Sequence, residues 1–260
     1  MHSYFQVAAF ARDPFSGNMA AVIILHSILS GEHMQKIASQ NNLPATAFVR
    51  VAETGFSIRW FTPQNELTLC GHATLASAHI LFELGLVTKG SKIHFIAGKN
   101  DLWASWNNGL ITMDFPIFQN QPTSIPPVLK SFLSSAVLST FRTQDRYLIE
   151  LKDEDSVRNL VPDFALLSPY KCIVTARCAP GSRYDFISRY FNGPDGVPED
   201  AVTGSSHCSL TPFWAGRLKK NILTAYQASP RGGELTLELQ NQQVRISGQA
   251  VTVVDGKWMI

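Results

Sequence analysis

Short apolar runs separated by polar turns dominate the first half of the chain, and runs of this length and composition predict β-strands. Asn107, Asn108 and Gly109 lie between two of these runs and predict a hairpin turn, because asparagine and glycine tolerate positive φ angles. The strands predicted in this half span residues 4–10, 20–25, 45–51, 56–62, 92–98, 102–106 and 110–116.

Two segments of the same half have helical spacing instead. Apolar residues recur at helical intervals after Ser30, a favoured N-cap residue, so a helix is expected over residues 31–40. A second helix is expected over 72–84, ended by Gly85. This second segment is apolar on almost every side, and a helix of that kind has to be buried.

Similar elements recur in the second half of the chain. They follow residues 116–127, which are rich in proline and polar residues and have the composition of a linker. A short helix is expected over 155–163 and a longer one over 206–218, in which Pro212 should introduce a kink. The strands expected in this half lie at 171–177, at 184–191 and in the tail after residue 222.

The order of these elements indicates an internal duplication, with chance similarity as the alternative. In both halves an Arg–aromatic–Phe strand, 59–61 or 189–191, leads through a polar loop to a glycine and then to a mostly apolar helix. The first N–H groups of a helix have no partner within it, and the helix dipole makes that end electropositive. Helices that start at Gly71 and Gly204 are therefore expected to attract a carboxylate or phosphate, and two such ends placed together would form a small-anion pocket.

Composition narrows the classes of function. The 260 residues have a formal net charge of +2 with 16% charged residues, which argues against binding to nucleic acid or to a membrane surface, since both need a basic patch. The four cysteines lack the spacing of a zinc site, so no metal is expected. Because no apolar run reaches about 18 residues and the first residues do not resemble a signal peptide, we expect a reduced, cytoplasmic protein.

Six motifs spread over nearly the whole chain point to one family. They read "PFSGNMAAV", "IRWFTPQNELTLCGHATLASAHILFE", "MDFP", "SRYF", "EDAVTGSSHC" and "QASPRGG". Together, and in this order, they resemble the phenazine-biosynthesis PhzF family. The resemblance implies an α+β fold of the diaminopimelate-epimerase-like type, with two similar domains, each a curved, mostly antiparallel sheet around a central helix, and an active-site cleft between them. Domains are expected at 1–116 and 117–249, and a final strand at 250–260 is a candidate to cross back to the first domain.

The resemblance also implies a function and a set of site residues. The best-understood members isomerise a dihydro-hydroxyanthranilic acid without metal or cofactor, using a glutamate that moves a proton between ring carbons with the help of a histidine and an aspartate. The histidine falls on His72 and the aspartate on Asp200. The glutamate of the family pattern N-L-S-E-T falls on Ala45, which cannot accept a proton. The residues expected to bind a small carboxylated substrate are Asn18, Gly71, Ala73, Thr203, Gly204 and Ser205.

Several alternatives stay open. The loss of a carboxylate at Ala45, and of another in "AAF" at 8–10, is also consistent with a binding or regulatory protein that lacks catalysis. A two-thiol racemase would need a second thiol near Thr203, where there is none. A hydrolase that uses Cys70 and His72 is disfavoured, because residues two apart on a turn into a helix rarely aim at each other. A homodimer is one option for the assembly.

Two structural alternatives concern the proposed catalytic groups. His72 is also compatible with a histidine that caps a helix, and Asp200 with an aspartate in an Asx-turn. Thr203 and Ser205 are expected to organise the backbone as N-cap residues rather than to act as nucleophiles, and the segment has neither the G-x-S-x-G nor the P-loop spacing.

Overall fold

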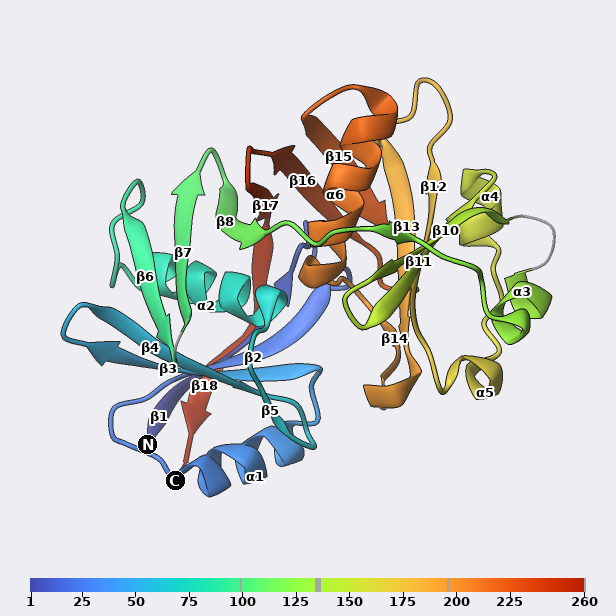
Figure 1. Ribbon diagram of the computed structural model, residues 1–260. Coiled ribbons are helices and arrows are strands. Elements are labelled where there is room, and N and C mark those ends of the chain that lie inside the picture. The colour runs from blue at the N-terminus through green and yellow to red at the C-terminus, as the bar shows by residue number, and fades with distance from the viewer. Residues whose placement is uncertain (99, 134–136, 196, 260) are drawn as a thin grey trace. The chain divides into compact units, whose positions relative to one another are not determined.

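In the computed structural model, which describes residues 1–98, 100–133, 137–195 and 197–259, the chain divides into two compact units. Unit 1 comprises residues 1–114 and 247–260, and unit 2 comprises residues 115–246. Each unit has an α+β fold in which a mainly antiparallel sheet packs around one long buried helix (Figure 1). Within the described residues, no helix is both long and apolar enough to cross a membrane.

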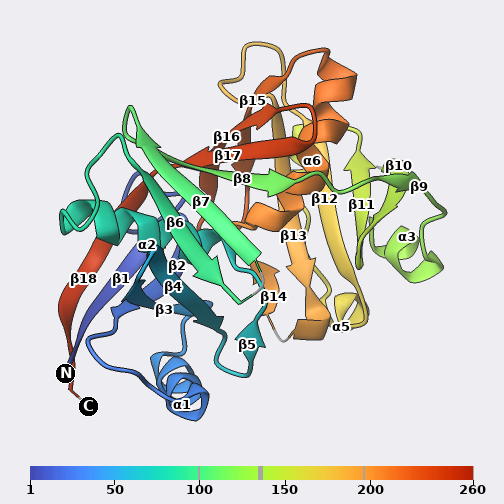
Figure 2. The same cartoon turned by 60° about the vertical axis from the view of Figure 1, so that its left-hand side comes forward.

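Unit 1 combines the N-terminal elements with the last strand of the chain. Strand β18 lies antiparallel to β1, so that both ends of the chain belong to this unit (Figure 2). Helices α1 and α2 cover opposite faces of the sheet (Figure 1). The elements are β1 (His2–Ala9), β2 (Asn18–Ile24), α1 (Gly31–Asn41), β3 (Ala45–Ala52), β4 (Gly55–Phe61), β5 (Glu66–Leu67), α2 (Gly71–Glu83), β6 (Lys92–Ala97), β7 (Asn100–Asn107), β8 (Leu110–Pro116) and β18 (Ala250–Trp258).

The two helices of unit 1 begin and end as the sequence predicts, to within a residue. The Ser30 side chain accepts the N–H of His33 and caps α1, and Asn42 ends that helix in the left-handed conformation. Every residue of α2 from 72 to 82 is buried, which confirms the prediction of a buried helix. Gly85 follows it with φ at +66°, and the N–H groups of residues 85 and 86 return to carbonyls of the last turn.

Unit 2 repeats the same order of elements around α6. Helices α3, α4 and α5 pack on one face of its sheet through a cluster of buried apolar residues, and α6 lies on the other (Figure 1). The elements are β9 (Gln121–Pro122), α3 (Pro127–Leu133), β10 (Val137–Thr143), β11 (Arg146–Leu151), α4 (Glu154–Arg158), α5 (Phe164–Leu167), β12 (Lys171–Arg177), β13 (Phe186–Asn192), the 3-10 helix η2 (Gly193–Asp195), β14 (Val197–Asp200), α6 (Gly204–Leu218), β15 (Ile222–Gln227), β16 (Gly233–Leu239) and β17 (Gln243–Gly248).

Two predictions for unit 2 were wrong in detail, and both involve proline. The helix expected over 155–163 is α4, which stops at Arg158; Pro162 follows, and α5 begins only at Phe164. Residues 116–127 are not a free linker, because part of this segment supports α6. Pro212 has no N–H to give to the carbonyl of Cys208, and the backbone N–H of Phe118 donates to that carbonyl instead at 3.1 Å. Helix α6 therefore continues through its proline.

The strand registers show the internal duplication more clearly than the sequence does. In the parallel pair β2–β3, Ala20 lies opposite Ala45, and in the parallel pair β11–β12, Tyr147 lies opposite Cys172, with the same offset along the chain. In unit 1, β4 pairs antiparallel with the short strand β5 before α2 and parallel with β6 after it. In unit 2, β13 pairs in the same way with β14 before α6 and with β15 after it. The two units thus share the same arrangement of strands around their long helix.

A pair of charged residues marks the equivalent position in each copy. Arg59 of β4 makes a two-bond contact with Glu66 of β5 at 2.7 and 2.8 Å, and Arg189 of β13 contacts Glu199 of β14 at the same two distances. The two glutamates lie at the same sequence distance before the glycines that start α2 and α6. In each unit this ion pair therefore fastens the short strand before the long helix, β5 or β14, to its neighbour in the sheet, β4 or β13.

Candidate functional site

The start of α2 carries the first predicted catalytic residue. His72 lies in the first turn of the helix, between Gly71 and Ala73, and is 8% exposed. Cys70 is the N-cap residue, and its Sγ lies 3.5 Å from Nδ1 of His72. The expectation that these two side chains would point apart is wrong, because the extended backbone at Cys70 turns the thiol toward the first helical turn. A thiol and an imidazole thus share this helix end.

Ala45 and Asn18 lie on neighbouring strands of the same unit. Ala45 is the first residue of β3, has no exposed surface, and lies opposite Ala20 of β2. Asn18 is the first residue of β2 and lies two residues before Ala20 in that strand. It is also fully buried. Gly17 precedes it with φ at +71°, and a Cβ there would come within 2.3 Å of a backbone carbonyl oxygen, so only glycine fits. Because α2 packs on β2 and β3, the predicted residues of unit 1 belong to one region.

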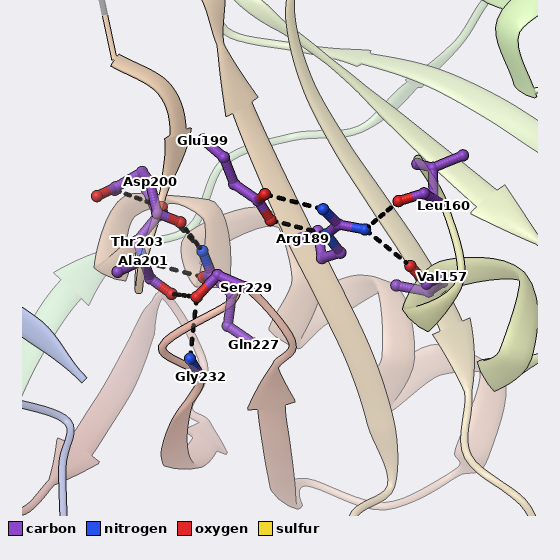
Figure 3. A network of polar contacts seen from close by, with 10 residues as sticks. All are labelled: Val157, Leu160, Arg189, Glu199, Asp200, Ala201, Thr203, Gln227, Ser229 and Gly232. Atoms are coloured by element: carbon purple, nitrogen blue, oxygen red, sulfur yellow. Dashed lines mark hydrogen bonds and ion pairs between the residues drawn. The ribbon is translucent and has the colours of Figure 1, made fainter. Parts of the chain in front are cut away.

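The second predicted catalytic residue ends β14, just before α6 (Figure 3). The hydroxyl of Thr203 donates a hydrogen bond of 2.5 Å to Oδ2 of Asp200. The prediction that Thr203 is an N-cap residue is confirmed for α6, although its side chain makes no capping bond to the helix. Its hydroxyl orients the carboxylate of Asp200 instead. Gly204 and Ser205 are the first two residues of the helix, so the same prediction is wrong for Ser205, which lies inside the helix.

A second set of side chains holds this segment in place (Figure 3). The buried amide of Gln227 bonds to the backbone of both Asp200 and Thr203, and the hydroxyl of Ser229 bonds to the carbonyl of Ala201. These residues belong to the motif "QASPRGG", for which the sequence predicts no role. The contacts could not be read from the sequence, because they join positions more than twenty residues apart.

Glu199, next to Asp200, has a structural role. Its carboxylate accepts two bonds from Arg189, and the two side chains are 8% and 7% exposed. Arg189 also donates to the carbonyls of Val157 and Leu160 (Figure 3). The buried pair therefore ties β13 and β14 to α4 and to the segment that follows it.

Arg146 was missed by sequence reasoning and lies at the start of α6. Its Nη1 donates to the Ser205 hydroxyl at 3.0 Å, and its guanidinium lies 5.0 Å from the ring centre of Tyr190. Burial alone would raise the pKa of Asp145, but Arg146 and Lys171 beside it hold that pKa below its usual value. The Arg146 guanidinium, which also pairs with Asp145 at 2.9 Å, thus lies beside the electropositive end of the helix.

The next residues of α6 belong to the core rather than to a reactive surface. His207 has no exposed surface, its Nδ1 bonds to the carbonyl of Thr203 at 2.9 Å, and burial lowers its pKa to about 4. Burial raises the pKa of the Cys208 thiol to about 12. Both groups are therefore neutral at pH 7. In the part of the chain that the structure describes, no three His, Cys, Asp or Glu residues are grouped to hold a metal ion.

The structure thus collects the predicted residues into two sets. Unit 1 contains Asn18, Ala45, Gly71, His72 and Ala73, and unit 2 contains Asp200, Thr203, Gly204 and Ser205. In each set some of the residues belong to the start of one long buried helix: Gly71, His72 and Ala73 begin α2, and Gly204 and Ser205 begin α6. A groove of about 670 Å³ in unit 2 is separate from these residues, since it is lined by the second half of α6 and the segments beside it. Joint action of His72 and Asp200 stays a prediction.

Comparison with known proteins gives one consistent result. A family model described as phenazine biosynthesis-like protein matches residues 7–256. An uncharacterized isomerase of Pseudomonas aeruginosa is 44% identical over 257 residues, which cover 98% of this chain and 97% of the relative. One from Halalkalibacterium halodurans is 42% identical with the same coverage. The crystal structure of a PhzF-family protein from Enterococcus faecalis superposes with a TM-score of 0.94 at 36% identity, covering 100% of this chain and 99% of the other.

Proposed function

Because the chain belongs to the phenazine biosynthesis-like family, we propose that it is a cofactor-independent isomerase that acts on a small carboxylated substrate by general acid–base proton transfer. Relatives that align over nearly their whole length are named isomerases, which supports this reaction class. In this proposal His72 and Asp200 transfer the proton.

The observation that carries the proposal is the ionisable side chain at the start of each long buried helix. His72 lies in the first turn of α2, and Asp200 lies directly before α6, where Thr203 fixes its carboxylate. The unpaired N–H groups at such ends suit a substrate carboxylate. Arg146 adds a guanidinium at the start of α6 that favours the same charge. An acid–base group and an anion-binding element therefore lie together in each unit.

The test is exchange of a substrate proton in deuterated water. The wild-type chain should incorporate deuterium into small cyclic carboxylic acids, and His72→Gln and Asp200→Asn should each lower the rate by about 10²–10⁴-fold. His33→Gln, at an exposed position on α1, is the control and should leave the rate unchanged. Absence of exchange with every acid tried, or rates unaffected by both variants, would overturn the proposal.

A second measurement addresses the carboxylate. Arg146→Gln should raise KM for the acid by at least about tenfold and leave kcat nearly unchanged, since a charge-assisted contact to bound substrate contributes about 1.5–3 kcal/mol. Arg142→Gln removes a guanidinium that lies over Tyr147 and is the matched control. An uncharged amide analogue of the substrate should not distinguish wild type from Arg146→Gln.

A second candidate function is a binding or regulatory protein that retains the fold without the chemistry. Ala45 favours it, because a buried methyl group stands where the family pattern has its base. In that case calorimetry would detect saturable binding of a carboxylated ligand, and no deuterium would enter it.

A further inference from the structure

The motif at Gln227–Gly233 has no part in the proposed proton transfer, yet it holds the segment that carries Asp200 (Figure 3). Gln227 is the last residue of β15 and has no exposed surface. Its Oε1 accepts the backbone N–H of Thr203 at 2.9 Å, and its Nε2 donates to the backbone carbonyl of Asp200 at 2.8 Å. One amide group therefore joins both ends of the segment that leads from β14 into α6.

The orientation of this amide is fixed by its partners. Only the amide oxygen can accept a backbone N–H, and only the amide nitrogen can donate to a carbonyl. Ser229 supports the middle of the same segment, since its hydroxyl donates to the carbonyl of Ala201 at 2.8 Å and accepts the N–H of Gly232 at 3.1 Å. The backbone of the segment is thus held at residues 200, 201 and 203 by the last residue of β15 and the loop that follows it.

The position of the Asp200 carboxylate depends on this arrangement. Its Oδ2 is bonded by the hydroxyl of Thr203, and the backbone of Thr203 is bonded by Gln227. Loss of the amide would leave the buried N–H of Thr203 and the part-buried carbonyl of Asp200 without this partner, and the segment would have to move to satisfy them. The carboxylate would move with it.

We infer that Gln227 is a positioning residue that sets the carboxylate of Asp200 for proton transfer. This inference rests on the proposed function. Because a displacement of about 1 Å at a reacting group can lower a rate by about 100-fold, loss of the amide should reduce kcat by that factor while KM changes little.

Two substitutions and one control test this role. Gln227→Met keeps the length of the side chain and removes all of its hydrogen bonds, whereas Gln227→Glu keeps an acceptor for the N–H of Thr203 but loses the donor to Asp200. Thr175→Val is the control, because the Thr175 hydroxyl bonds to the carbonyl of Ile187 and to Nε1 of Trp214, under the same helix, and to neither Asp200 nor Thr203. It should lower stability without moving Asp200.

Hydrogen exchange of the Thr203 amide reports positioning without an activity assay. It should accelerate at least about tenfold in Gln227→Met and remain slow in Gln227→Glu and Thr175→Val. In the deuterium-incorporation assay, kcat should fall in both Gln227 variants and stay near wild type in Thr175→Val.

The outcomes separate this inference from the proposed function. Wild-type kcat in both Gln227 variants, or an equal loss in Thr175→Val, would overturn the positioning role while the isomerase proposal stands. If the wild-type protein exchanges no substrate proton, the proposed function fails. The hydrogen-exchange rate of the Thr203 amide is then the one measurement that tests whether Gln227 holds the segment from Asp200 to Thr203 in place. An unchanged amide exchange rate in Gln227→Met would then reject the inference.

Discussion

At the scale of single residues, the proposed chemistry depends on which side chain accepts the proton. Ala45 offers only a methyl group, fully buried at the start of β3. His72 contacts the Cys70 thiol, and Asp200 accepts the Thr203 hydroxyl, so both are held by neighbours at a helix start. His72 and Asp200 are the acid–base groups predicted for the site, and the prediction that Ala45 stands at the position of the family's glutamate implies a limit on what they can do.

Restoring a carboxylate at position 45 tests that limit. Ala45→Glu should raise the exchange rate on the dihydro-hydroxyanthranilate substrate of the family by at least about 100-fold, because a positioned base contributes about 10²–10⁴-fold, or roughly 3–5 kcal/mol. Ala45→Gln has the same size without basicity and should add nothing. Both variants bury a polar group, so thermal unfolding is measured beside the rates. Equal rates in the two variants would show that the base is elsewhere.

The cysteines differ in their surroundings more than in their exposure. Cys70 and Cys178 are 6% and 5% exposed, but burial and the neighbouring Glu154 raise the pKa of Cys178 to about 12. Cys70 has an imidazole 3.5 Å away that can accept its proton. Iodoacetamide at pH 8 should therefore label Cys70 before Cys178, as mapped by mass spectrometry. His72→Gln should slow the labelling of Cys70 alone; equal labelling of both thiols in the wild-type protein would contradict this reasoning.

At the scale of secondary-structure elements, each long helix depends on the strands that lead into and out of it. Arg59–Glu66 and Arg189–Glu199 occupy equivalent positions before α2 and α6, but the first pair is about two-fifths exposed and the second is almost fully buried. Exposed pairs contribute little to stability, whereas breaking a buried pair leaves an uncompensated charge. The two ion pairs should therefore contribute different amounts to the free energy of unfolding.

This difference can be measured by one matched pair of substitutions. Arg189→Met should lower the free energy of unfolding by about 3–5 kcal/mol, because Glu199 and the carbonyls of Val157 and Leu160 lose their donor. Arg59→Met should lower it by no more than about 1 kcal/mol. Urea denaturation of both variants gives the comparison. Similar losses would mean that burial does not decide the strength of these pairs.

Helix α6 should also make the protein sensitive to acid. Burial lowers the pKa of His207 to about 4, whereas an unfolded histidine titrates near 6.5, so the unfolded state binds more protons between these values. The contribution of neutral His207 to the free energy of unfolding is fully present above about pH 6.5. It is lost as the pH falls toward 4, and the total loss is about 3 kcal/mol. Unfolding measured from pH 7 to 4 should show this loss in the wild-type protein and a smaller one in His207→Gln. Parallel curves for the two proteins would exclude His207 as the source.

The sequence was informative about elements whose signals are local. Ser30, Gly85 and the pair Asn108–Gly109 mark helix ends and a hairpin turn, and the structure places all of them there, with both turn residues at positive φ. The short strands β5 and β14 were not predicted, because two to four residues carry no readable pattern. The roles of Arg146 and Gln227 depend on contacts between distant strands, and no local pattern encodes such contacts.

At the scale of the whole molecule, the chain closes its first unit with its last strand. β18 pairs with β1 from Ala9–Ala250 to His2–Trp258, and it also contacts α2, where Nε2 of His79 lies 3.0 Å from the Thr252 hydroxyl. Unit 2, by contrast, has its own apolar core between its sheet and helices α3 to α5. The two units therefore depend to different degrees on the C-terminal residues.

Removal of residues 250–260 tests this dependence. The shortened chain should lose amide protection throughout β1 and α2, because β1 loses a strand partner along its whole length and buried surface of unit 1 becomes exposed. The strands β12 and β13 of unit 2 should keep their protection, since all of their pairings lie within residues 115–246. Hydrogen exchange read by mass spectrometry follows both units in one experiment, and a chain shortened by residues 259–260 alone, beyond β18, is the control. Equal loss of protection in the two units would show that they fold as one cooperative body, and no loss in unit 1 would show that β18 is dispensable for its fold.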